Sequence, residues 1–107
     1  MRTASTIHTY KVVTPQMRSL GLRANPTILT FSVGKWVASP KKQAAHADAG
    51  GIWSARTLGG ARALVRYMQR HYGIRCRIFA AEIDRVLRGN SYRVQSPKIR
   101  LLAELPV

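Results

Sequence analysis

The sequence predicts one α+β domain, residues 1–107, in which a principal helix at about 57–72 packs on a mainly antiparallel sheet of about six strands. Only one stretch repeats its apolar residues at helical spacing, whereas short runs rich in β-branched and aromatic residues occur on both sides of it. An order of strands, helix and strands is typical of an α+β fold. The length of 107 residues matches one domain, and with 46% hydrophobic residues the chain can bury a core without disulfides.

The residues before the predicted helix alternate between extended runs and turn-forming residues. Pro15 ends the first extended run and Gly21 stops the segment after it. Gly34 interrupts a later apolar run, which indicates a bulge or a tight hairpin corner. We expect a strand at residues 6–13, a short helix at 16–22 and one or two strands at 27–39. A polar mobile loop at 40–51 and a short strand at 52–55 should follow.

The predicted helix has the clearest periodicity in the chain. Thr57 is typical of an N-cap, and Gly73 is typical of the residue that ends a helix. Apolar residues at intervals of three and four predict a core-facing stripe of Leu58, Ala61, Val65, Met68 and Tyr72. A second face carries a row of arginines, Arg62, Arg66 and Arg70, with no acid placed along the helix to pair with them. This row fits either a solvated helix face or a surface that binds phosphates.

The residues after the helix predict three more strands. We expect them at residues 75–83, 91–94 and 98–105, with a turn or a single helical turn at 84–90. Alternation along the first of them points Cys76 into the core, and because a lone cysteine cannot form an internal disulfide, a reducing cytoplasm fits best. No apolar run approaches the roughly 18 residues of a membrane span, so we expect a cytoplasmic protein without membrane contact.

The charge of the chain bears on its partners. Eighteen Lys and Arg residues face four acids, which gives a net charge of +14, and most of the cations are arginine. Arginine binds phosphate bidentately and stacks on bases, so this excess favours nucleic acid or another polyanion, although a genome rich in G and C would also enrich arginine. Trp36, Trp53 and Tyr92 are candidates both for the core and for base stacking. The predicted polyanion-binding residues are Arg56, Arg62, Arg66, Arg70, Arg75, Arg77 and Arg93.

Catalytic and metal-binding patterns are weak. The histidines are scattered and there is one cysteine, so no metal site is expected. Glu82 and Asp84 alternate at one strand end without a second carboxylate pair opposite, which favours ion pairs with arginine over acid–base catalysis. No phosphate-binding loop, dinucleotide fingerprint or zinc finger is present. The residues alone therefore favour a binding protein over an enzyme.

Three segments, taken in order, resemble the ADP-ribosyltransferase family, which includes diphtheria-toxin-like enzymes and poly(ADP-ribose) polymerase catalytic domains. The segment Y-K-V-V-T-P-Q-M-R-S-L-G-L at 10–22 is similar to the family's first strand and following helix. The segment G-G-I-W-S-A-R-T at 50–57 resembles its G-I-Y-F-A strand and the helix with a late Tyr, here Tyr67. The segment N-S-Y-R-V-Q-S-P-K-I-R-L-L-A-E-L at 90–105 resembles its N-E-Y-x-V strand and final strand.

The resemblance implies a split sheet with a nucleotide-sized cleft. NAD would lie against Tyr10, Lys11, Trp53 and Tyr67, with Lys11 at the adenosine ribose and Trp53 on the nicotinamide. Ser91 falls where the family has the glutamate that stabilises the oxocarbenium-like transition state, work that a neutral hydroxyl cannot do electrostatically. The leading interpretation is therefore a catalytically degenerate member whose basic surface binds nucleic acid or another polyanion.

Two other functions remain open at this stage. One is an NAD-dependent ADP-ribosyltransferase, a toxin or effector, that uses the cleft between Lys11, Trp53 and Ser91. The other is an inhibitor of the phage or toxin–antitoxin type, whose basic face docks on an acidic protein partner.

Overall fold

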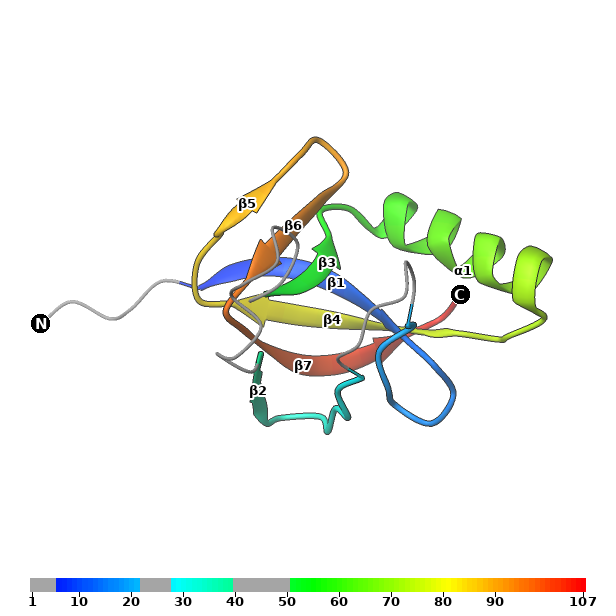
Figure 1. The fold of residues 1–107 in the computed structure, drawn as a ribbon, viewed down its shortest axis with the longest axis horizontal. Coiled ribbons are helices and arrows are strands. Elements are labelled where there is room, and N and C mark those ends of the chain that lie inside the picture. The colour runs from blue at the N-terminus through cyan, green and yellow to red at the C-terminus, as the bar shows by residue number, and fades with distance from the viewer. Residues whose placement is uncertain (1–5, 22–27, 40–50) are drawn as a thin grey trace, which may run out of the picture.

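A seven-stranded antiparallel sheet forms the body of the computed structural model, which describes residues 6–21, 28–39 and 51–107 (Figure 1). Within these ranges one helix accompanies the sheet, so the α+β prediction is confirmed. The elements in chain order are β1 (Ile7–Val13), β2 (Trp36–Ala38), β3 (Ile52–Ala55), α1 (Leu58–Tyr72), β4 (Arg77–Ile83), β5 (Arg88–Gly89), β6 (Arg93–Ser96) and β7 (Lys98–Leu105).

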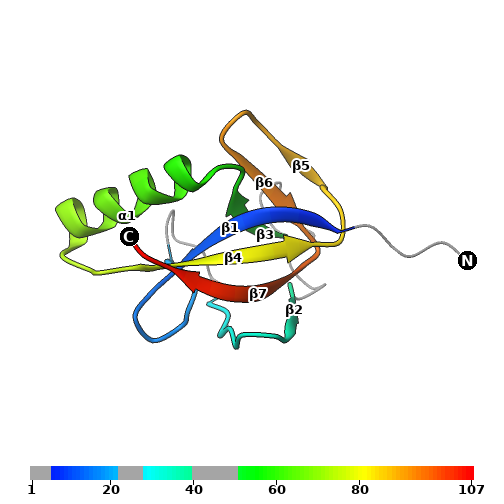
Figure 2. The same ribbon diagram turned by 180° about the vertical axis from the view of Figure 1, so that it is seen from behind.

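The strands lie in the order β2-β7-β4-β1-β3-β6-β5. The long strands β1, β4 and β7 form the centre, and β1 pairs with β4 along its whole length, from Ile7 opposite Ile83 to Val13 opposite Arg77. β1 and β3 share only one register pair, Tyr10 with Ala55. Beyond that point β3, β6 and β5 run at an angle to the long strands, as both views show (Figures 1 and 2).

Local signals explain where α1 begins and ends. The Thr57 hydroxyl accepts a hydrogen bond from the Gly60 N–H at 3.0 Å, which is an N-cap contact. Gly73 has φ 66° and its N–H donates to the Gln69 carbonyl, which terminates the helix. In both views α1 lies at the same end of the sheet as the C-terminus (Figures 1 and 2).

The two faces of the sheet carry separate apolar cores because strand residues alternate in direction. On one face, α1 packs Ala61, Val65 and Met68 against Val12 and Ile78. On the other face Phe31 and its partly buried neighbours, which come from the connection between β1 and β2, cover residues of the strands. This core consists of Val13, Phe31, Ile52, Phe79, Ala81, Ile83, Val94, Ile99 and Leu101. Each face is thus closed by a different part of the chain.

The short helix predicted for residues 16–22 is wrong over the part that the structure describes. Met17 has φ 64°, outside the right-handed helical region, and Arg18 forms an isolated bridge with Thr30. The backbone of Phe31 then donates to the Met17 carbonyl at 2.8 Å, so a distant segment takes the hydrogen bond that a helix would have made internally. Within residues 28–39, the described part of the run predicted as strand, only β2 and Thr30 of that bridge pair with other strands or segments, and Gly34 forms a turn with φ 85°.

Two further expectations need correction. Residues 84–90 were expected to form a turn, but Arg88 and Gly89 pair with Gln95 and Val94 as β5, which gives seven described strands instead of about six. Tyr72 was expected in the core stripe, but it is 56% exposed because the last turn of α1 extends past the core residues. The predicted strands at 52–55 and 98–105 are confirmed, and the loop predicted at 40–51 lies, except for Gly51, outside the described residues.

Candidate polyanion-binding site

Four arginines border a cavity of about 560 Å³ beside α1. We call this cavity the arginine groove, and it is lined by Arg62, Val65, Arg66, Gln69, Arg70, Arg75, Cys76 and Val107. Its volume is in the range of small-molecule sites, which run from about 300 to 1,000 Å³. The groove is a partly open hollow whose lining is almost all hydrocarbon, and the positive charge of the four arginines lies around it.

Helical spacing aligns three of these arginines. Arg62, Arg66 and Arg70 recur every four residues and therefore follow one another at about 6 Å along the helix axis. Val65, between them in sequence, is buried against the sheet and so fixes the rotation of this row relative to the core. The left-handed turn at Gly73 reverses the chain, and Arg75 returns to the same cavity from the segment before β4.

The groove arginines carry uncompensated charge. All four are exposed, and none of them forms a hydrogen bond, ion pair or ring contact with another residue in 6–21, 28–39 or 51–107. Arg70 lies in the last turn of α1, where a cation interacts favourably with the helix dipole. Dipole interaction explains one arginine of the four, so the fold itself does not account for the cluster.

Two of the three acidic side chains in the described ranges, Glu82 and Glu104, are bound to arginines of the sheet. Arg100 pairs with Glu82, which also accepts a hydrogen bond from the Thr6 hydroxyl at 2.8 Å. The hydrogen bonds from Thr6 and Arg100 lower the pKa of Glu82, and the hydrogen bond from Arg77 lowers the pKa of Glu104. Both glutamates therefore stay ionised and bound to sheet residues at neutral pH.

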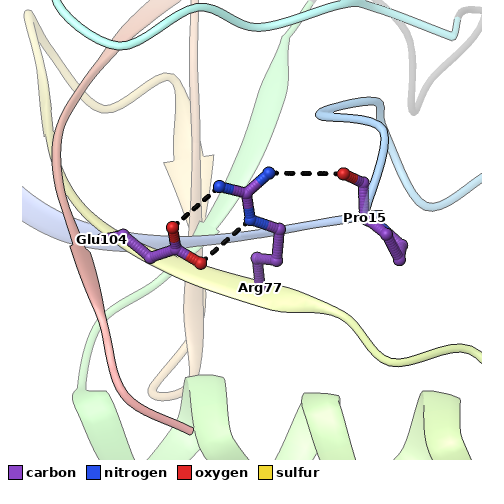
Figure 3. Close-up of polar contacts among 3 residues, drawn as sticks. All are labelled: Pro15, Arg77 and Glu104. Carbon is purple, nitrogen blue, oxygen red and sulfur yellow. Dashed lines mark hydrogen bonds and ion pairs between the residues drawn. The ribbon is translucent and has the colours of Figure 1, made fainter.

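Three of the predicted polyanion-binding arginines do not join the groove. Arg56 donates to the Asn90 carbonyl at 2.6 Å and so ties the start of α1 to the β5–β6 hairpin. Arg93 lies over the Trp53 ring at 4.1 Å. Arg77 donates to both oxygens of Glu104, at 2.9 and 2.7 Å, and to the Pro15 carbonyl at 3.3 Å (Figure 3). Each is held by a partner from a distant part of the chain.

Lys11 and Trp53, which the family resemblance places in a nucleotide cleft, are neighbours but face opposite ways. The Lys11 ammonium donates to the Trp53 carbonyl at 2.7 Å and lies 5.5 Å from the centre of the Phe31 ring. Alternation directs the Trp53 ring to the other face of the sheet, where Arg93 covers it. The ammonium and the indole ring therefore do not line one cavity.

The environment of Lys11 is that of a buried cation. Only 9% of the residue is exposed, and burial lowers the pKa of Lys11 to about 8. The hydroxyls of Thr9 and Ser54 are buried without a hydrogen-bond partner in the described structure. The carbonyl of Trp53 and the face of Phe31 are the groups that compensate for burying the ammonium.

The other predicted cleft residues either point to the opposite face of the sheet from Lys11 or lie on other elements. Tyr10 shares the α1 side of the sheet and packs against that core. Tyr67 is exposed on α1, where it contacts His71 with ring centres 4.4 Å apart. Ser91 is exposed in the turn between β5 and β6. None of these three residues lines the arginine groove.

The sequence predicts Trp36 as a candidate stacking surface, but it does not predict Gln69 in the groove or the two cations that lie over Trp36. Gln69 lines the groove, and its place three residues after Arg66 on the same helix could have revealed it. Trp36 is 37% exposed and has Lys98 and Arg100 at 4.9 and 5.0 Å from its ring centre. Both cations project from β7 opposite β2, a pairing that no local sequence signal specifies.

Two absences complete the description of the site. The residues that the structure describes contain no group of three or more His, Cys, Asp or Glu side chains placed to hold a metal ion. Nor do they include a helix long and apolar enough to span a membrane.

Comparison of the chain with protein-family models, with curated proteins and with solved structures gives no match.

Proposed function

We propose that this protein binds nucleic acid through the arginine groove. The observation that carries the proposal is the convergence of Arg62, Arg66, Arg70 and Arg75 on one cavity, exposed and without partners in the described part of the chain. Arginine is suited to bidentate contact with phosphate oxygens, and a regular row of cations can follow a phosphodiester backbone. The net charge of +14 would also accelerate the approach of a polyanion.

Anisotropy titrations of nuclease-treated protein with short labelled oligonucleotides at several salt concentrations test this function. The double variant Arg62→Ala/Arg66→Ala is compared with Lys35→Ala/Arg85→Ala, which removes the same charge from exposed residues that do not line the groove. On a single strand each lost phosphate contact lowers the salt slope by about 0.7, so we expect a fall of up to about 1.4 for the groove variant and a much smaller one for the control.

Two results would contradict the proposal. Equal losses in the two double variants would mean that binding follows total charge and not the groove. Absence of oligonucleotide binding, with one acidic protein retained in stoichiometric amount after nuclease treatment, would assign the basic surface to protein docking instead.

A further inference from the structure

The floor of the arginine groove differs chemically from its rim. Val65 and Cys76 are buried at its base, and because burial raises the pKa of the Cys76 thiol, neither side chain carries charge near neutral pH. Gln69 is the neutral polar side chain among the lining residues. The four exposed arginines line the groove mainly with the hydrocarbon part of their side chains, and their guanidinium groups lie around it.

A phosphate group by itself would satisfy only part of this site. It could pair with the arginines, but it would leave the apolar floor in contact with water. A flat aromatic group attached to a phosphate would cover the floor and pair with the guanidinium groups together, because apolar surface gains free energy when it leaves water and arginine also stacks on aromatic faces. A nucleobase on a phosphodiester chain has this composition.

We propose that the arginine groove takes an unpaired base onto its apolar floor while the arginines hold the adjacent phosphates, so that the protein selects single-stranded nucleic acid. This inference rests on the proposed function and specifies its ligand. In a duplex the bases are paired and stacked, so a duplex offers the groove phosphates alone, and extracting a base costs unstacking and unpairing energy. In a single strand every base has a free face.

The test compares three ligands that carry the same number of phosphates in the binding strand. They are a thymidine oligonucleotide, an abasic oligonucleotide of equal length, and the thymidine strand annealed to its complement. Since an arginine over an aromatic face at an exposed site is worth roughly two- to fivefold in affinity, we expect the thymidine strand to bind about two- to fivefold tighter than the abasic strand, with the same salt slope. We also expect it to bind tighter than the duplex.

A pair of tryptophan variants locates the effect. Gln69→Trp places a large side chain in the groove, whereas Ala63→Trp places it on an exposed position of the same helix that does not line the groove. We expect Gln69→Trp to tighten thymidine-strand binding by roughly tenfold, because the indole gives the base an aromatic face, and to leave abasic binding unchanged. Ala63→Trp should leave both affinities unchanged, and circular dichroism checks that both variants keep the helix.

The outcomes separate this inference from the proposed function. Abasic binding as tight as thymidine binding, or tighter binding of the duplex, overturns the base site and leaves nucleic-acid binding by the arginines standing. An equal effect of the two tryptophan variants also overturns it, since the floor would then not be the contact. Failure of all three ligands to bind overturns the proposed function and the inference together.

Discussion

Arg77 and Arg100 in the sheet each lie against a glutamate, whereas Arg62, Arg66, Arg70 and Arg75 around the groove have no partner in the part of the chain that is described. The sheet arginines join neighbouring strands, since β4 and β7 exchange both ion pairs. The groove arginines make no such link between elements of the described structure. The difference separates cations that stabilise the fold from cations whose charge is available to a ligand.

The largest expected effect is on binding by the groove. Replacing its four arginines with alanine should weaken oligonucleotide binding on the order of 100-fold to 1,000-fold at low salt, because up to four phosphate contacts are lost. The free energy of unfolding should change by no more than about 0.5 kcal/mol per substitution, since exposed side chains without partners in the described structure are removed. Anisotropy and urea denaturation of the same preparation measure both quantities. A large loss of stability would mean that these arginines also support the fold.

Lys11 provides the next largest effect, because it is a cation that the fold buries. Its folded pKa of about 8 lies below the ordinary value of 10.5, so between these values the unfolded chain binds more protons than the folded chain. The free energy of unfolding should therefore rise with pH across this interval, by at most about 3 kcal/mol. Urea denaturation from pH 7.5 to 10.5, with Lys11→Met as the reference, isolates this change from other titrating groups. Parallel curves for the two proteins would refute it.

The elements that sequence predicted well are those with local signals. Three signals define α1: the N-cap Thr57, the terminating Gly73 and the spacing of apolar residues by three and four between them. Each of these signals depends only on residues close together in the sequence. β5 could not be predicted in this way, because its two residues become a strand only by pairing with β6. There a side chain on Gly89 would lie 2.6 Å from the Arg93 carbonyl, so the close approach requires glycine.

The candidate site also contains both residues placed by local spacing and residues placed by contacts between distant segments. The spacing of Arg62, Arg66 and Arg70 predicts that they share one face of α1, and all three line the groove. Sequence could not distinguish Arg75, which reaches the groove, from Arg56, Arg77 and Arg93, which do not. The partners that hold these three residues are the Asn90 carbonyl, Glu104 and the Trp53 ring, all brought close by sheet pairing between distant segments.

A smaller effect is expected at Glu82, the partner of Arg100. Glu82→Gln should lower stability at pH 7, because the charge-assisted hydrogen bonds from Arg100 and Thr6 are weakened. The pKa of this carboxyl is lowered in the fold, so its contribution is present above its ordinary value of 4.5 and is lost as the pH falls through the folded value. The stability difference between the two proteins, measured in urea, should therefore shrink toward pH 3. A difference that stays constant would show that the carboxylate charge is not responsible.

The smallest effect is expected for the pair of Arg77 and Glu104, whose side chains are 36% and 46% exposed (Figure 3). Water and salt screen an exposed pair, so a double-mutant cycle with Arg77→Gln and Glu104→Gln should give a weaker coupling than the same cycle at Arg100 and Glu82, where the glutamate side chain is only 9% exposed. Raising the salt concentration should reduce the first coupling more than the second. A stronger or more salt-resistant coupling at Arg77 would mean that its third contact, with the Pro15 carbonyl, orders the arginine enough to outweigh exposure. The division between fold-stabilising and ligand-binding cations would then depend on geometry more than on burial.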